Sequence, residues 1–254
     1  MKKMITILAV AMLLWGASAS ADTLDFLKPF WMQMMDGVSN TASGKIPENV
    51  TVTCADERLT VEACGVLLEN DYSTEAHVYA VLKNTGSERL PIRSVQMTVL
   101  GANGNTLHKE DYVSYMPSVV EPGETMLVSE WMYDFVKEIG KVDSIQISVE
   151  TASRVYEKWK QLGDVRAWLD GDYLCVEFTN TTEKTLFGVI CAATVSDANG
   201  QILDMMMQSP YDTDDLGIAQ GSSIVWRKRL EDAATLKIGT DAVCKAWAYR
   251  MEDL

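Results

Sequence analysis

Five cysteines are the side chains of this sequence best suited to covalent chemistry, either as thiol nucleophiles or as disulfides. They are Cys54, Cys64, Cys175, Cys191 and Cys244. A thiol becomes a nucleophile when a neighbouring base or cation lowers its pKa, and the sequence nominates no such partner. Disulfides are possible between Cys54 and Cys64, which bracket a predicted hairpin, and between Cys175 and Cys244. Strand alternation places Cys175 and Cys191 on opposite faces and argues against that pair. The alternative for all five is that they fill small apolar spaces.

The sequence contains few of the residues that metal binding or hydrolysis requires. Two histidines, His77 and His108, are too few for a multi-histidine metal site. The run Asp212-Thr213-Asp214-Asp215 could offer oxygens to Ca²⁺, but it lacks the spacing and the bidentate glutamate of an EF-hand loop. A solvated acidic loop is the simpler interpretation. No nucleophile elbow, zinc-binding helix motif or phosphate loop is present in the sequence. We therefore assign no catalytic residue, no cofactor and no metal ligand.

Tryptophans offer a different kind of site. Trp131, Trp159, Trp168, Trp226 and Trp247 would suffice for an aromatic platform that stacks on sugar rings. Packing in a core or between domains is the alternative role of such side chains.

Charge and composition restrict the partners. The chain has 254 residues, with 36 acidic and 22 basic side chains and a formal net charge of −14. Such a field repels nucleic acids and anionic membranes. A hydrophobic content of 47% with 23% charged residues is that of a globular protein. We expect no nucleic-acid partner.

The first 21 residues have the order of a secretory signal peptide. Lys2 and Lys3 precede an apolar run from Met4 to Trp15, and small residues lead to Ala21. An uncleaved anchor is the alternative, but the run is shorter than the roughly 20 residues that span a bilayer. We expect cleavage after Ala21 and a secreted or extracytoplasmic protein without membrane contact. Loss of the two lysines takes the charge from −14 to −16.

The remaining chain contains a repeat. Residues 79–85 match 175–181, and the Ala-Asn-Gly of 102–104 recurs at 198–200, both at a shift of 96. Residues 122–124 and 143–145 correspond to 220–222 and 241–243 at a shift of 98, so the second copy carries a two-residue insertion. Four motifs in one order indicate a duplication.

The repeated unit is predicted to be all-β. A period of two over residues 77–83 indicates a half-buried strand, with Tyr79 and Lys83 facing outward. The predicted inner faces of the two copies consist of Val78, Ala80 and Leu82, and of Leu174, Val176 and Phe178. Turns are predicted after each strand at 84–86 and 180–182 and, more strongly, at Asn103-Gly104 and Asn199-Gly200.

Four segments show helical spacing or lack alternation. Residues 22–44 form an N-terminal segment and linker, in which apolar residues from Leu24 to Met35 fall on one helical face. We expect this segment to dock on the first domain; an adhesive segment is the alternative. Residues Arg154–Leu162 are predicted as a helical connector, and Met132–Ile139 and Leu230–Leu236 as short helical crossovers.

The unit resembles the FxLYD-type domains of exported bacterial proteins. The resemblance lies in a strand ending in Asn-Thr, an alternating strand that runs into a glycine turn, and a Pro-Gly before the next strand, over residues 77–131 and 173–226. The naming motif falls on Met97, Val99, Leu100 and Gly101 in the first copy, and on Ala193, Val195, Ser196 and Asp197 in the second, where the aspartate alone is retained. The resemblance implies an immunoglobulin-like fold and carries no catalytic residue.

These observations predict two tandem immunoglobulin-like β-sandwich domains, at residues 45–152 and 153–254, after a short N-terminal helical segment and with a helical connector between them. We expect a non-catalytic protein that contacts a protein or cell-surface component through loops and edge strands. A carbohydrate-binding module that uses exposed tryptophans is the alternative. An enzyme of unrecognised type ranks behind both.

Overall fold

The computed structural model describes residues 50–68, 75–132, 142–153, 158–208, 217–231, 234 and 237–252, and their regular elements are β-strands. The predicted all-β class is confirmed. The signal peptide at 1–21, the N-terminal segment at 22–44 and the acidic run at 212–215 lie outside the described residues. Within the described part, no helix has the length and apolar character needed to cross a bilayer.

The strands of the first half form two sheets. One has the order β1-β9-β4-β5, with β7 paired to β4, and the other has the order β2-β3-β8-β6. The bounds of the first sheet are β1 Thr51–Cys54, β9 Val142–Thr151, β4 Leu90–Gly101, β5 Thr106–Glu110 and β7 Val119–Val120. Those of the second are β2 Leu59–Leu68, β3 Ala76–Asn84, β8 Thr125–Met132 and β6 Ser114–Met116. Strands β1 and β9 are parallel, and the other neighbours are antiparallel.

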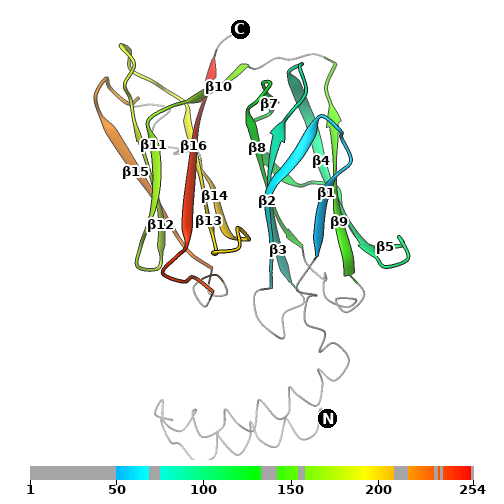
Figure 1. Cartoon of the computed structure of the whole chain (residues 1–254). Helices are drawn as coiled ribbons and strands as arrows, with labels where there is room; N and C mark the ends of the chain where they lie inside the picture. The colour runs from blue at the N-terminus through cyan, green and yellow to red at the C-terminus, as the bar shows by residue number, and fades with distance from the viewer. Residues whose placement is uncertain are drawn as a thin grey trace, which may run out of the picture. The chain divides into compact units, whose positions relative to one another are not determined.

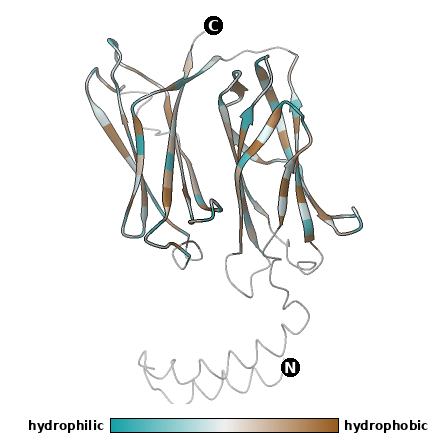
Figure 2. Cartoon of the chain, viewed as in Figure 1, coloured by the Kyte–Doolittle hydropathy of each residue, from teal (hydrophilic) through white to brown (hydrophobic). Residues whose placement is uncertain are grey.

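The second half also forms two sheets, with the orders β10-β16-β13-β14 and β11-β12-β15. Their bounds are β10 Lys158–Leu162, β16 Val243–Glu252, β13 Val189–Ser196, β14 Ile202–Gln208, β11 Val165–Asp170, β12 Tyr173–Thr179 and β15 Ser223–Arg229. Figure 1 shows the four sheets as successive layers, with β10 running between the halves. The turns that join the strands are mainly hydrophilic, whereas the strands hold most of the hydrophobic residues (Figure 2).

The predicted inner faces are buried. Val78, Ala80 and Leu82 have no exposed surface and pack in the core of the first half. Leu174, Val176 and Phe178 occupy the core of the second half. Alternation therefore located one face of each strand correctly, because the side-chain period of a strand is two.

The prediction that Tyr79 faces outward is wrong. Its side chain is 1% exposed and packs in the same cluster as Met205 and Tyr249 of the second half. The β2-β3-β8-β6 sheet is covered on both faces, because the β10-β16-β13-β14 sheet packs against its second face. A hydrogen bond from Tyr249 Oη to Thr125 O, at 3.0 Å, crosses this boundary. Lys83 is partly exposed.

The predicted helical connector is also wrong over its described part. Lys158–Leu162 is strand β10, which pairs antiparallel with β16. Pairing with a sheet edge supplies the backbone hydrogen bonds of this segment, and Trp159 still packs against the core. Met132 ends β8, and the rest of the first predicted crossover lies outside the described residues. Residues 232–233 and 235–236 of the second predicted crossover lie outside the described residues, and within it Ala234 N donates to Glu231 O at 2.9 Å.

Candidate functional site

The five cysteines lie at buried or partly buried positions. All are free thiols, so neither Cys54–Cys64 nor Cys175–Cys244 is paired in it. Cys54 and Cys64 pack at the edge of the first core, and burial raises the pKa of each thiol. Burial also raises the pKa of Cys191, which is fully buried. A raised pKa leaves a thiol protonated and weakly nucleophilic at neutral pH.

The five candidate tryptophans lie in different environments and do not form one row. Trp226 and Trp247 are buried, at 7% and 9% exposure. Trp159 packs against the core, and the Trp131 ring contacts the His77 ring in a tilted arrangement at a centroid distance of 4.5 Å. Trp168 occupies a strand face opposite to the core. Packing against other side chains therefore accounts for Trp131, Trp159, Trp226 and Trp247, and Trp168 is the exception.

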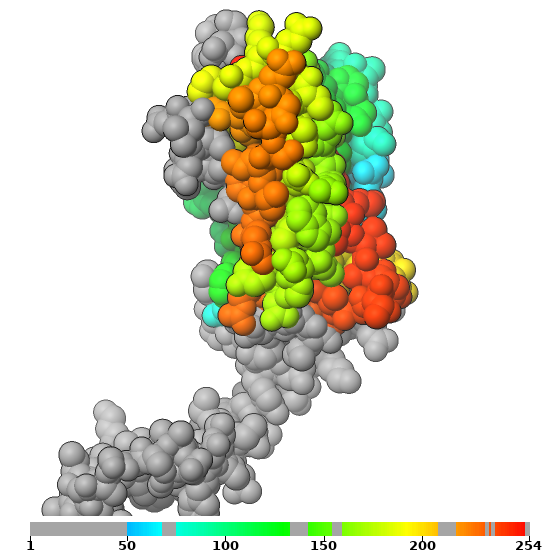
Figure 3. Space-filling model, turned by 90° about the vertical axis from the view of Figure 1, so that its left-hand side faces the viewer, coloured from blue at the N-terminus to red at the C-terminus, as the bar shows by residue number. Residues whose placement is uncertain are grey.

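Trp168 belongs to an open sheet surface that the sequence patterns did not single out. Strands β11, β12 and β15 are in register, so alternate residues share the face turned away from the core. We call this surface the outer face; it consists of Arg166, Trp168, Asp170, Tyr173, Glu177, Val225, Arg227 and Arg229. Cys175 lies on the same side of β12 but is 1% exposed. Figure 3 views the molecule from this side, where the three strands lie uncovered.

Arginines cover the aromatic rings of the outer face. The guanidinium carbon of Arg166 lies 5.3 Å from the ring centre of Trp168, and that of Arg227 lies 4.6 Å from the ring centre of Tyr173. Cation–π contacts of this kind hold both groups in place. Tyr173 and Val225 remain 39% and 47% exposed. The face therefore presents ordered aromatic, aliphatic and cationic groups to the solvent.

The charge of the outer face differs from that of the whole chain. Arg227 Nη2 pairs with Asp170 Oδ2 at 3.1 Å, and Arg166 pairs with Glu177. Among the described residues, Arg229 has no acidic partner. Three arginines thus meet two carboxylates here, on a chain whose net charge is −14. The sequence held one signal for this face, because Arg227 and Arg229 alternate with Lys228. A strand face can be recognised as solvent-exposed only when the sheets that pack beside it are known.

Comparisons with known proteins give little further information. No protein-family model matches the chain, and a search of the curated proteins finds no match. Among solved structures, the chain is similar to red sea bream transglutaminase, with 11% identity and a TM-score of 0.22. The likeness covers 78% of this chain and 29% of that one, so the chain spans less than a third of that protein's length.

Proposed function

We propose that the chain is an exported, non-catalytic protein with two immunoglobulin-like domains, at residues 45–152 and 153–254, that binds a protein or cell-surface component. The outer face of the β11-β12-β15 sheet is the contact surface, and its arginine-covered aromatic side chains are the observation that carries the proposal. Aromatic and arginine side chains are the groups most enriched at the energetic centres of protein interfaces.

Two buried asparagines support the duplication. Asn84 Nδ2 donates to carbonyl oxygens four and 36 residues further along the chain, at 2.9 and 3.0 Å. Asn180 Nδ2 donates to carbonyl oxygens four and 38 residues further along, at 2.8 and 2.7 Å. Each Oδ1 accepts the amide hydrogen two residues on, at 3.0 Å. The difference between 36 and 38 equals the two-residue insertion inferred from the repeat.

Strand order gives a second support. The orders β9-β4-β5 and β2-β3-β8 in the first half correspond to β16-β13-β14 and β11-β12-β15 in the second. The halves differ at two edges: β1 is parallel to β9 whereas β10 is antiparallel to β16, and β6 has no counterpart strand among the described residues of the second half. Two sheets of this size packed face to face are the architecture of an immunoglobulin-like sandwich.

The partner of the outer face should carry carboxylates. Arg229 is unpaired among the described residues, and Arg166 and Arg227 can exchange their present acids for those of a partner. The rest of the acidic chain repels a partner that carries carboxylates, so the partner is directed to the outer face. A well-placed interface arginine contributes about 2 kcal/mol, or about thirtyfold in affinity.

Affinity capture from the surface fraction of the producing cell tests this proposal. The wild type, Arg227→Ala and Tyr173→Ala serve as baits, with Arg93→Ala as the control. Arg93 is an exposed arginine that pairs with Glu150 in a different sheet. We expect a saturable partner that the two outer-face variants lose and the control retains, with binding that weakens as salt increases. Equal capture by all four baits would remove the outer face from the proposal.

Carbohydrate binding is the second candidate, since Trp168 and Tyr173 lie on the same face. A glycan array distinguishes it. Saturable binding of a neutral glycan, lost in Trp168→Ala, would replace the protein partner by a sugar.

A further inference from the structure

Strand β15 lies at the edge of the β11-β12-β15 sheet. In an antiparallel pair, hydrogen-bonded and non-hydrogen-bonded residue pairs alternate. At one end of the β12–β15 pairing, Asn180 N donates to Ser222 O at 3.0 Å. At the other end, Leu230 N donates to Asp172 O at 2.9 Å. The even-numbered residues of β15 therefore bond to β12 through their backbones, and the odd-numbered residues do not.

The odd-numbered residues direct their backbone N–H and C=O groups to the edge of the sheet. Their side chains lie on the side of the outer face, because successive side chains of a strand alternate. Among the described residues, β15 pairs with β12 alone, and no other backbone group bonds to this edge. A row of donors and acceptors thus lies beside the arginines, at Ser223, Val225, Arg227 and Arg229.

The first half of the chain shows what the fold places at the corresponding edge. Strand β8 corresponds to β15 at the repeat shift of 98, so Leu127 and Ser129 correspond to Val225 and Arg227. In β8 these two residues pair with the short antiparallel strand β6. The edge that accepts a strand in the first half has no such strand among the described residues of the second.

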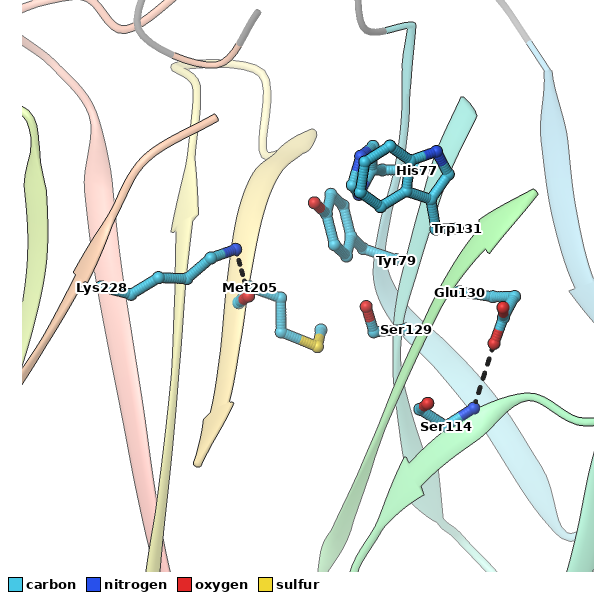
Figure 4. Close-up of a pocket in the computed structure, with 8 residues that line it drawn as sticks. All are labelled: His77, Tyr79, Ser114, Ser129, Glu130, Trp131, Met205 and Lys228. Atoms are coloured by element: carbon cyan, nitrogen blue, oxygen red, sulfur yellow. Dashed lines mark hydrogen bonds between the residues drawn. The ribbon is translucent and has the colours of Figure 1, made fainter. Parts of the chain in front are cut away.

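Strand β14, the edge of the facing sheet, is closed by side chains. Met205 N donates to Asp204 Oδ1 at 2.7 Å, and Met205 O accepts from Lys228 Nζ at 3.1 Å. Figure 4 shows the Lys228 side chain crossing from β15 to Met205. Charged side chains at an edge hinder the addition of another strand. No described side chain bonds in this way to the backbone of Val225 or Arg227, so β15 is the edge that accepts a strand.

The side chains of β15 select the added strand. Residues directly opposite one another in an antiparallel pair interact, and opposite charges stabilise the pair. Arg229 has no acidic partner among the described residues, and Arg227 lies two positions before it on the same face. Val225, two positions earlier again, is 47% exposed. A complementary strand therefore carries acids opposite the two arginines and an apolar residue opposite Val225.

We propose that β15 binds an extended peptide as an additional antiparallel strand, and that this peptide has acidic residues at alternate positions followed by an apolar residue. The inference rests on the outer face as the contact surface and specifies how a partner binds there. Hydrogen bonds to the backbone of β15 provide affinity, and the acids fix the register on the arginines. The antiparallel direction follows that of β6 on β8.

Fluorescence polarisation of a labelled heptapeptide, Glu-Thr-Glu-Thr-Val-Thr-Val, tests the proposal. In the proposed register its glutamates lie opposite Arg229 and Arg227, and its first valine lies opposite Val225. The amides of the second glutamate and the first valine then donate to β15, whereas those of the first two threonines face away. N-methylation of the donating pair should weaken binding about thirtyfold, since two hydrogen bonds are lost. N-methylation of the threonine pair is the matched control and should leave the dissociation constant nearly unchanged.

Two further changes separate backbone from charge. The peptide with glutamines in place of both glutamates should bind more weakly, and salt should weaken the glutamate peptide alone. Val225→Pro removes one N–H from the open edge and leaves the bonds to β12 in place, a position where an edge strand tolerates proline. It should lower the affinity for the glutamate peptide about fivefold, with folding checked by circular dichroism. The N-methylated peptides decide the question with the wild type if this variant does not fold.

Equal affinities of the two N-methylated peptides, or no binding of the parent peptide, would overturn strand addition. A dimer that Val225→Pro dissociates, with no peptide binding, would assign the edge to a second copy and would overturn it as well. The outer face fails as a contact surface by a different result, which is capture of the cellular partner by Arg227→Ala and Tyr173→Ala as well as by the wild type.

Discussion

Substitution of Gly65 by alanine should separate the two middle sheets, β2-β3-β8-β6 and β10-β16-β13-β14. Gly65 lies in β2, and a Cβ built on it would stand 1.8 Å from the carbonyl oxygen and 2.7 Å from the carbonyl carbon of Ile202 in β14. An ordinary C···O contact is about 3.3 Å. Both atoms belong to backbones, so no side chain can turn aside. Strands β2 and β14 would have to move apart by about 1.5 Å.

That displacement determines the size of the effect. The bond from Tyr79 Oη to Asp204 Oδ1, at 3.3 Å, crosses the same boundary and would be broken. The loss of one hydrogen bond to a charged group costs about 1.5–3 kcal/mol, and forced overpacking costs about 1–3 kcal/mol. Together they lower the free energy of unfolding of Gly65→Ala by about 2.5–6 kcal/mol.

Urea denaturation followed by tryptophan fluorescence measures this loss. Gly163→Ala is the control, because a Cβ at Gly163 meets no atom within 4 Å. The control should stay within about 0.5 kcal/mol of the wild type. If the middle sheets unfold together in the wild type and separately in Gly65→Ala, the variant should also show a lower denaturant slope. Equal midpoints for the two alanine variants would refute the close packing of β2 against β14.

Three other predictions concern single residues. Asn84→Ala and Asn180→Ala each remove two hydrogen bonds to carbonyl oxygens and one from a backbone amide, so each should lower the free energy of unfolding by about 2–4 kcal/mol, to a similar extent in urea denaturation. Because burial lowers the pKa of His77 from its ordinary value of 6.5, protonation favours the unfolded state. The stability of the wild type relative to His77→Gln should therefore fall as the pH drops below about 6.5, measured as melting temperature; an increase would contradict the burial argument. Amino-terminal sequencing of exported protein should begin at Asp22, and a chain that begins at Met1 would show an uncleaved segment.

Much of the local structure could be predicted because it depends on neighbours in sequence. Alternation in β3 and β12 identified one buried face of each strand. Asn103-Gly104 and Asn199-Gly200 form turns, with Gly104 and Gly200 at φ of 74° and 83°. Positive φ is open to glycine at little cost, so these dipeptides are local signals that distant contacts rarely override.

The second face of β3 could not be predicted, because it depends on residues more than a hundred positions away. Tyr79 alternates with Val78 and Ala80, and a strand at a solvent boundary would show the same pattern. The apolar side chain of Val81, which lies on that second face, was the available indication that the face is buried. Likewise, Trp159 and Leu162 fit a helix spacing, but the free edge of β16 offered a strand pairing that no local pattern reveals.

Asp204 is an acidic residue buried between the two halves. It stands in an apolar strand with no exposed surface. Its oxygens accept from Tyr79 Oη, Lys228 Nζ and the amides of Met205 and Glu231, at 2.6–3.3 Å. A buried carboxylate is tolerated when donors occupy its lone pairs and a cation lies beside it. These donors come from β3, β14, β15 and the residue that follows Leu230, so a shift of any of these segments would leave the charge unpaired. The carboxylate thus fixes the alignment of the two halves.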